Sequence, residues 1–318
     1  MKCTPKGWAA LGFCAAAACL LSLLLALALR QEPDFTLIAE LGEADACDSA
    51  QGMAVSDRYA YVAQRGDGDA RAVIHRVEIP TGERVLMTDS ATRLTVFTGL
   101  GHANDLDHAE FAGVEYLYVL AEARILVFEI LGTELKAQAA YDLTYNGRPF
   151  FPTGFAVRAA DDSHITFLFK WATTVSSGAI RKEATSGSIG VSVMGYLDES
   201  QLAEPDDWTR QAMDCIGNML YVALSGNGTD TDANRSVILG YDLSEFTGSN
   251  HVSPAPEQIF HLIGEEYPAL FEVEDVALDP SGRMYFNTNG RISSSDTAHD
   301  GVFVMNRSFS HDAARPEP

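Results

Sequence analysis

The amino-acid sequence predicts an all-β fold made of repeated units. Residues 274–286, Glu-Asp-Val-Ala-Leu-Asp-Pro-Ser-Gly-Arg-Met-Tyr-Phe, show the pattern: an apolar run, a turn at Asp-Pro-Ser-Gly and a second apolar run. Apolar runs bounded by turn residues are typical of paired strands. After the first thirty residues no segment has sustained helical periodicity, so we expect strands to supply the core.

This strand–turn–strand pattern occurs five times. Each copy starts with a polar residue and places an aromatic residue in its second strand, 10 to 14 residues later. The starts are 53, 49, 58 and 63 residues apart, which fits four-stranded units with insertions. The starting residues are Gln51, Asn104, Thr153, Gln211 and Glu274, and the aromatic residues are Tyr61, Tyr118, Phe167, Tyr221 and Tyr285.

A ring of five such units predicts a single five-bladed β-propeller over residues 35–308. The strand-like segment 35–41 precedes the first repeat, whereas the fifth repeat has only residues 302–305 as a third strand. We therefore expect 35–41 to pair with 302–305, because closing the ring removes the exposed sheet edges. Residues 309–318 are expected to form a disordered tail.

The third and fourth repeats contain the longest predicted loops. In the third, polar and small residues at 173–188 precede a strand at 191–194, and 198–207 have helical or loop character. In the fourth, residues 225–236 separate the second and third strands. This insertion contains the D-x-D-x-N opening of a calcium loop without its glycine and its glutamate, so it is interpreted as a flexible acidic loop.

Composition excludes one class of partner. The chain has 318 residues, of which 47% are hydrophobic, so it is long enough to bury a substantial core. It carries 44 acidic and 22 basic residues, a formal charge of −22. A nucleic-acid backbone would be repelled by this charge, so nucleic acid is not an expected partner. The acidity fits solubility or cation binding.

The N-terminal 30 residues predict a signal peptide or a signal anchor. Lys2 and Lys6 precede an uncharged run at residues 8–29, whose 22 residues are long enough to span a bilayer. The Ala-Leu-Ala at residues 26–28 also fits a cleavage site. The lysines predict a cytoplasmic N-terminus, with the C-terminal domain outside the cytoplasm on a single-pass membrane anchor, or secreted if the segment is cleaved.

The two cysteines beyond this segment, Cys47 and Cys215, are not expected to form a disulfide. Cys47 lies four residues before one inner strand, and Cys215 lies four residues after the start of another. The two repeats are not adjacent, so the separation exceeds the Cα distance of about 6 Å that a disulfide requires.

The repeat at 274–286 resembles those of gluconolactonase-like and NHL-type β-propellers, and the resemblance covers roughly residues 35–308. It implies a fold rather than a function. Gluconolactonase-like propellers hold a divalent cation with carboxylate and amide side chains at the starts of the inner strands. The resemblance therefore implies Asn104 and Glu274 as metal ligands, with Ca²⁺ as the candidate ion. Gln51, Thr153 and Gln211 do not supply the further carboxylates of that site.

The candidate binding site is the mouth of the central channel, where the five inner strands would start. The polar residues there either bind a ligand or satisfy strand ends and ordered water. Aromatic residues precede the inner strands at Phe150, Phe151, Trp208 and Phe271, and they either line a pocket or pack between the sheets. The ligand-binding candidates are Gln51, His102, Asn104, Thr153, Trp208, Arg210, Gln211 and Glu274.

The segment 101–108 is the densest cluster of ionisable residues. His102 is interpreted either as a general base in the mouth or as a hydrogen-bond partner of a neighbouring loop. Asp105 and Asp275 occupy matching positions and are expected to tie sheets together, and His108 is expected to be structural. The loops between second and third strands, 225–236 included, are expected on the face opposite the mouth.

Two functions follow from these patterns. The first is a membrane-anchored, extracytoplasmic ligand-binding or protein-interaction module for a small molecule, glycan or protein. The alternative is a metal-dependent hydrolase of the lactonase type that uses Glu274, Asn104 and His102. G-x-S-x-G, H-E-x-x-H, Walker A and G-x-G-x-x-G sequences are absent in the required context, which disfavours the common hydrolase, protease and nucleotide-binding classes.

Overall fold

The computed structural model describes residues 34–306 except 67, 162, 203–206, 227–233, 247–251, 294 and 296–298. The apolar run at 8–29, the tail at 309–318 and most of the acidic loop at 225–236 lie outside these residues. Within the part of the chain that is described, no helix has the length and apolar character needed to cross a membrane.

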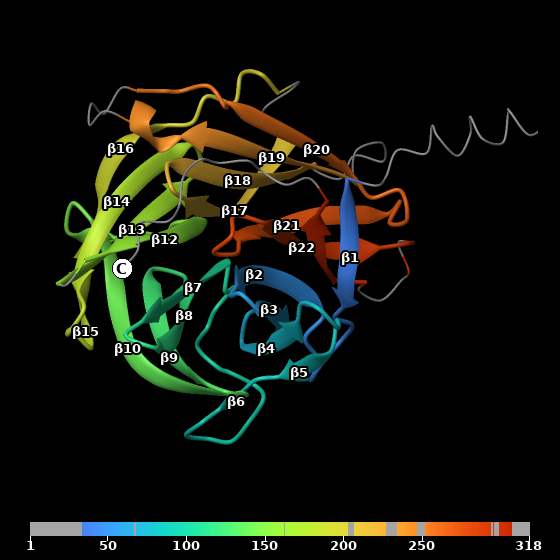
Figure 1. The fold of residues 1–318 in the computed structure, drawn as a ribbon, viewed down its shortest axis with the longest axis horizontal. Coiled ribbons are helices and arrows are strands. Elements are labelled where there is room, and N and C mark those ends of the chain that lie inside the picture. The colour runs from blue at the N-terminus through green and yellow to red at the C-terminus, as the bar shows by residue number, and fades with distance from the viewer. Residues whose placement is uncertain are drawn as a thin grey trace, which may run out of the picture. The chain divides into compact units, whose positions relative to one another are not determined.

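The strands form five sheets arranged around a common centre (Figure 1). Four sheets have four strands and one has seven. Sheet 1 contains β2 (Ser49–Val55), β3 (Tyr59–Gly66), β4 (Arg71–Glu78) and β5 (Arg84–Leu86). Sheet 2 contains β7 (Asp105–Phe111), β8 (Val114–Ala121), β9 (Arg124–Leu131), β10 (Glu134–Tyr145) and β11 (Arg148–Pro149), with β6 (Thr88–Asp89) and β15 (Ser186–Gly190) pairing parallel to β10.

The other three sheets follow the same plan. Sheet 3 contains β12 (Gly154–Ala160), β13 (His164–Trp171), β14 (Thr174–Arg181) and β16 (Ser192–Tyr196). Sheet 4 contains β17 (Trp208–Ile216), β18 (Met219–Gly226), β19 (Arg235–Asp242) and β20 (Gln258–Ile263). Sheet 5 contains β21 (Leu270–Leu278), β22 (Met284–Arg291), β23 (Gly301–Met305) and β1 (Phe35–Glu40).

The first strands of the sheets form a closed inner ring. β2, β7, β12, β17 and β21 each contact the inner strands of both neighbouring sheets. Five hydrophobic clusters fill the five spaces between neighbouring sheets. The repeated aromatic residues are all buried in these clusters: Tyr61, Tyr118, Phe167, Tyr221 and Tyr285. The chain therefore has an all-β propeller fold.

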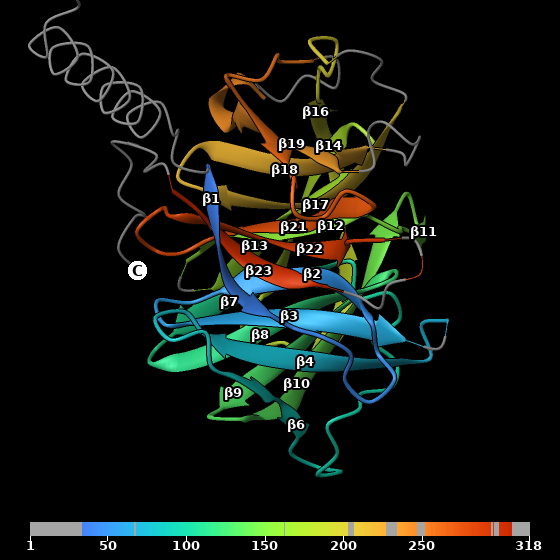
Figure 2. The same cartoon turned by 90° about the vertical axis from the view of Figure 1, so that its right-hand side faces the viewer.

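The N-terminal and C-terminal ends of the domain share sheet 5 (Figure 2). β1 pairs antiparallel with β23, with Phe35 opposite Met305, which confirms the predicted pairing. The Phe35 ring packs against Phe271, Phe286 and Phe303 at centroid distances of 5.4–5.6 Å. Aromatic contacts of this kind contribute beyond the burial of apolar area, so side chains reinforce the backbone pairing that closes the ring.

Three of the predicted inner-strand starts are wrong. Gln51, Gln211 and Glu274 lie inside β2, β17 and β21, at places where the pairing register shifts. Asn104 and Thr153 do lie immediately before β7 and β12. The register shifts are β-bulges, which interrupt the alternation of side chains and make a polar residue inside a strand look like a strand start.

The third repeat also differs from its prediction. Residues 173–188 contain strand β14, and β15 leaves sheet 3 to pair with β10 of sheet 2. A Cβ atom on Gly178 would lie 2.6 Å from Ile189 Cγ2, so β14 needs a residue without a side chain where the next segment crosses it. The small residues that suggested a loop therefore serve close packing.

The loops between second and third strands lie on the face where the inner strands begin, so the predicted opposite face is wrong. The His102 side chain, before β7, contacts Asp69 in the β3–β4 loop: Nδ1 and Oδ2 are 3.1 Å apart. Antiparallel neighbours reverse direction at each turn. The second strand of every sheet therefore ends where the first strand starts, and its outgoing loop joins the same rim.

Candidate functional site

Buried carboxylates on the inner strands accept hydrogen bonds from backbone N–H groups of other inner strands. Asp105 Oδ2 accepts hydrogen bonds from Phe155 N at 2.7 Å and Met213 N at 3.2 Å. Asp275 Oδ2 accepts one from Met53 N at 2.6 Å. The prediction that Asp105 and Asp275 tie the sheets together is confirmed.

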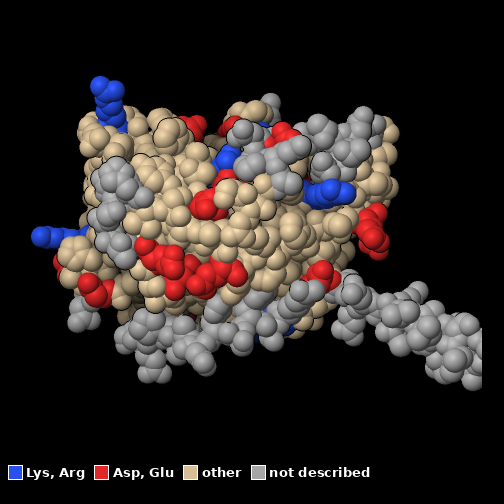
Figure 3. Space-filling model, turned by 90° about the horizontal axis from the view of Figure 1, so that it is seen from above, with Lys and Arg blue, Asp and Glu red and all other residues tan. Residues whose placement is uncertain are grey.

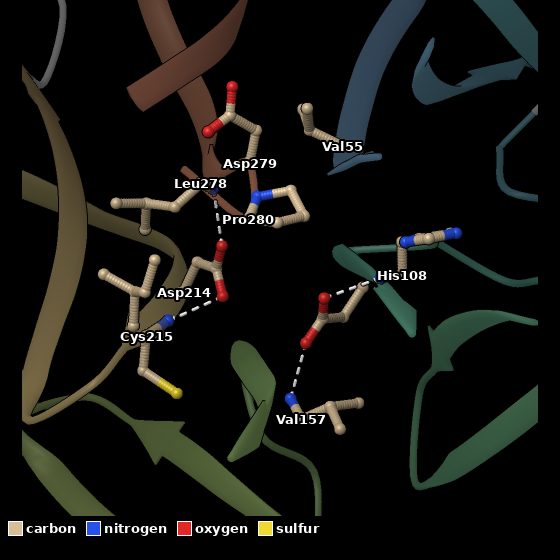
Figure 4. A pocket seen from close by; sticks show the side chains of 10 residues that line it. Val55, His108, Val157, Asp214, Cys215, Leu278, Asp279 and Pro280 are labelled. Atoms are coloured by element: carbon tan, nitrogen blue, oxygen red, sulfur yellow. Dashed lines mark hydrogen bonds between the residues drawn. The ribbon is translucent and has the colours of Figure 1, made fainter. Parts of the chain in front are cut away.

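A second tier of carboxylates lies farther along the inner strands, with Asp107 on β7 and Asp214 on β17 (Figure 4). Asp107 Oδ2 accepts from Val157 N at 2.5 Å, and Asp214 Oδ2 accepts from Leu278 N at 2.7 Å. The cavity beside them measures about 20 Å³, which is room for roughly one water molecule. This end of the channel is therefore a structural junction.

His108 and the cysteines also have structural surroundings. His108 is buried, lies 3.2 Å from Glu115 Oε1 through Nε2 and stacks on Tyr61. This agrees with the structural role expected for His108. Cys47 and Cys215 do not form a disulfide with each other, as predicted. Cys215 lines the small cavity next to Asp214.

Lys170 is a buried cation that the sequence did not single out. It lies on β13 opposite Gly154, and its Nζ donates to Thr153 Oγ1 at 3.1 Å. Burial lowers the pKa of Lys170 to about 8, against the opposing influence of Asp105. Burial also raises the pKa values of Asp105 and Asp275, and for Asp105 the neighbouring Asp275 adds to the effect. Through its hydrogen bond from Lys170, the predicted site residue Thr153 belongs with the polar residues of the channel.

At the mouth of the channel, Glu272 contacts both Gln211 and Glu274. Gln211 Nε2 donates to Glu272 Oε1 at 2.9 Å, and Asn289 Nδ2 donates to Glu274 Oε1. Burial raises the pKa of Glu274 well above its usual value, and the charge of Glu272 is the next largest cause. Glu274 therefore holds a proton more readily than an exposed glutamate.

The two predicted metal ligands lie on different parts of the ring, Glu274 on β21 and Asn104 immediately before β7. Glu274 is buried and bonded to Asn289, while Asn104 is half-buried before β7. In the ranges that the structure describes, no three His, Cys, Asp or Glu side chains are placed to hold a metal ion. Gln51 turns toward its own strand, where Nε2 donates to Ala50 O at 2.6 Å.

The remaining predicted residues serve the rim and the core. His102 is paired with Asp69, as the loop-contact interpretation expected. Arg210 binds Glu199 through Nε, at 3.2 and 3.0 Å from the two carboxylate oxygens, and through Nη2 at 2.5 Å. Trp208 packs against the cluster between sheets 3 and 4, and Phe271 is fully buried between sheets 4 and 5. Trp208 and Phe271 therefore pack between sheets, which is one of the two roles expected for them.

A separate aromatic cleft lies beside the mouth, between sheets 2 and 3. Its volume is about 700 Å³, within the range of about 300–1,000 Å³ found for small-molecule sites. Trp171 and Phe151 are each 57% exposed, so their rings face solvent. The aromatic cleft is lined by Tyr145, Asn146, Arg148, Pro149, Phe150, Phe151, Trp171, Thr174, Ser176, Val193 and Tyr196.

Two tight hairpins hold the walls of the aromatic cleft. β10 and β11 are joined through Asn146 and Gly147, with Tyr145 paired to Arg148. β13 and β14 are joined through Ala172 and Thr173, with Trp171 paired to Thr174. Two-residue hairpin loops fix the register of the strands they join. The exposed rings of Tyr145 and Trp171 therefore stand at hairpin positions of fixed register.

The sequence prediction found only part of this cleft. Phe150 and Phe151 were named as rim residues and do line it, whereas Tyr145, Arg148, Trp171 and Tyr196 were missed. The Asn-Gly pair at 146–147 was an available signal for a hairpin next to an aromatic residue. No comparable signal marks Tyr196, which reaches the cleft only because β16 is the outer strand of sheet 3.

Comparisons with known proteins return structures only. No protein-family model and no curated protein matches the sequence. Matching structures include a β-xylosidase/α-arabinofuranosidase from a compost microbial metagenome, with 14% identity, TM-score 0.49 and coverage of 89% of this chain and 96% of that one. An α-L-arabinofuranosidase from Podospora anserina has 10% identity, TM-score 0.49 and coverage of 86% and 98%. An exo-1,5-α-L-arabinanase from a bovine ruminal metagenomic library has 10% identity, TM-score 0.49 and coverage of 85% and 97%.

Both functions expected from the sequence disagree with the names of these matching structures. The matching structures are named as glycoside hydrolases, neither as lactonases nor as non-catalytic binding modules. The narrower resemblance to gluconolactonase-like and NHL-type propellers is likewise unsupported. At 10–14% identity the likeness is one of chain course, and the activity has to be argued from the site.

Proposed function

We propose that this chain is a carbohydrate-active enzyme that binds a saccharide in the aromatic cleft and hydrolyses it. The observation that carries the proposal is the cleft of about 700 Å³ with exposed rings and adjacent polar groups. A sugar ring presents an apolar C–H face and a rim of hydroxyl groups. Flat aromatic rings match the former, and Asn146, Arg148 and Thr174 can bind the latter.

Glu274 is the proposed general acid. It keeps a proton because burial raises its pKa, and its contact with the half-buried Glu272 favours the same protonated form. Glycoside hydrolysis needs a carboxyl group that protonates the leaving oxygen, and a base that assists the attack of water acts from the other side of the scissile bond. Glu272 lies too close to Glu274 to flank the bond in this way. In this proposal a saccharide bound in the aromatic cleft extends to the channel mouth, where Glu274 donates its proton to the glycosidic oxygen, water adds to the anomeric carbon, and the proton that the water loses passes to solvent.

The test is turnover of oligosaccharides by the full chain. Xylan-, arabinan-, glucan-, mannan- and galactan-derived oligosaccharides, and their uronic acid counterparts, are incubated with the protein and new reducing ends are measured. Glu274→Gln is expected to lower kcat by about 10²–10⁴-fold, the usual contribution of a general acid. Trp171→Ala is expected to raise KM at least about tenfold, because a ring that stacks on the sugar is removed.

Leu94→Ala is the matched control for Trp171→Ala. Leu94 is an exposed apolar residue, 59% accessible, that does not line the aromatic cleft. It is expected to change neither kcat nor KM. Absence of turnover across the panel, or turnover that survives both Glu274→Gln and Trp171→Ala, would contradict the proposed function.

We further propose that the five sheets are the five blades of one propeller. The support is the inner ring of five strands and one hydrophobic cluster between each neighbouring pair of sheets. β6 and β15 then count as additions to the second blade. An experimental structure in which these sheets divide into four or six radial units would reject this count.

Placement outside a cytoplasmic membrane also stays a proposal. It rests on the sequence of residues 1–30, with a signal anchor at 8–29 or cleavage near residue 28 as the two alternatives. Cell fractionation with N-terminal sequencing separates them: an anchored chain keeps its N-terminus, and a secreted one begins near residue 29. A cytoplasmic full-length chain excludes both.

A further inference from the structure

Arg148 is the one charged residue among those that line the aromatic cleft. Its side chain is exposed, and it makes no hydrogen bond or ion pair with any other described residue. Two other exposed arginines, Arg58 and Arg124, form ion pairs with Glu78 and Asp142. Arg148 differs from them in lining an aromatic cleft, in a chain that has twice as many acidic as basic residues.

The backbone fixes where this arginine stands. Arg148 begins β11 directly opposite Tyr145, the last residue of β10. The two residues between them, Asn146 and Gly147, have φ angles of 51° and 72°. Positive φ at both positions is the signature of a tight hairpin turn that matches the twist of its strands. The turn therefore places Arg148 directly across from Tyr145 at one wall of the cleft.

The chemistry of the cleft selects the kind of saccharide. A guanidinium is planar and offers paired N–H donors that fit a carboxylate in a bidentate fashion. A neutral sugar would leave this charge unpaired, whereas a uronic acid would place a planar carboxylate next to a sugar ring stacked on the aromatic wall. Figure 3 shows one face of the molecule, on which acidic side chains gather in a patch and basic side chains stand apart from one another.

We propose that Arg148 makes the aromatic cleft selective for saccharides that contain a uronic acid, with its guanidinium binding the sugar carboxylate. This rests on the proposed function, since it names the substrate class of the same cleft. Sulfated sugars share the negative charge, but sulfate is a much less basic anion than a carboxylate, so its oxygens accept weaker hydrogen bonds from a guanidinium. The uronate is therefore the favoured ligand.

The experiment measures Kd by calorimetric titration of the full chain with three matched probes. They are cellotetraose, the same chain oxidised at C6 to a uronate, and its 6-O-sulfate. The uronate is expected to bind about tenfold more tightly than the neutral probe, as for one charge-assisted contact at an accessible site. In Arg148→Gln the Kd values of the two probes are expected to agree within about threefold.

Arg148→Lys and Arg124→Gln complete the design. Lysine keeps the charge and loses the planar fork, so it should reduce the preference for the uronate over the neutral probe without abolishing it. Arg124 is an exposed arginine in an ion pair with Asp142, and Arg124→Gln should keep the uronate preference. Equal binding of the uronate and neutral probes by the wild type, or a preference that survives Arg148→Gln, overturns this inference alone.

The proposed function fails in a different way. If none of the probes binds, or if binding is unaffected by Trp171→Ala, the aromatic cleft is no saccharide site and both proposals fall together. A preference for the sulfate over the uronate in the wild type would leave the saccharide site in place and reject the uronate.

Discussion

The channel axis and the aromatic cleft are neighbours built in opposite ways. On the axis, carboxylates such as Asp105 and Asp275 are completely buried and bind backbone amides of other sheets. In the cleft, the large apolar side chains of Phe151 and Trp171 are more than half exposed. Ionisable residues, which usually indicate chemistry, here serve structure, whereas aromatic residues, which usually serve structure, remain accessible to a ligand.

The comparison teaches that the partner of a side chain decides its role. A buried carboxylate with an amide N–H partner is a satisfied hydrogen-bond acceptor, and breaking that pair leaves a buried donor unpaired. An exposed tryptophan on a tight hairpin has no such partner, and part of its apolar surface stays in contact with water. The first arrangement stabilises the fold, and the second leaves an apolar surface available to a ligand.

The largest expected effect comes from removing a carboxylate on the axis. Asp105→Ala leaves the N–H groups of Phe155 and Met213 without their acceptor. Each buried unpaired donor costs about 1–3 kcal/mol, so the loss of the acceptor for both donors should lower the free energy of unfolding by about 2–6 kcal/mol in chemical denaturation. The control is Asp142→Ala, which removes an exposed ion pair with Arg124 and should cost less than about 1 kcal/mol. Similar losses for both variants would remove the distinction between axis and surface.

The next effect concerns pH and Lys170. The pKa of Lys170 falls from 10.5 to about 8 on folding, so between these values the unfolded chain binds more protons than the folded one. The free energy of unfolding should therefore rise with pH across this window, by as much as about 3 kcal/mol relative to Lys170→Met. Denaturation curves of both proteins at pH 7.5 and 10 measure it. An identical pH dependence in the two would show that Lys170 is not held in a dry channel.

The smallest effect is expected at His102, which the sequence offered as a general base. Its pair with Asp69 is exposed by more than a third on both sides, so His102→Ala should change the free energy of unfolding by less than about 1 kcal/mol. Turnover in the assay described above should stay within about threefold of the wild type. A hundredfold loss of kcat at unchanged stability would show instead that His102 takes part in catalysis.

The sequence by itself determined the repeat and the closure of the fold. Apolar alternation and turn residues are local signals, and they were sufficient to place the five strand pairs and to predict that β1 joins β23. The matching positions of Asp105 and Asp275 were enough to predict their structural role. The register within strands was less accessible, because the bulges at Gln51, Gln211 and Glu274 depend on how neighbouring sheets approach.

Only the tertiary structure decided the site. The cleft is formed by Tyr145 and Arg148 on one hairpin, Trp171 on another and Tyr196 on an outer strand, 51 residues after Tyr145. The burial of Lys170 likewise depends on the inner ring around it rather than on its own strand. Exposure and proximity are properties of the packed sheets. A sequence pattern reports which residues are present along a strand, and the packing of one sheet against the next decides which of them still face the solvent.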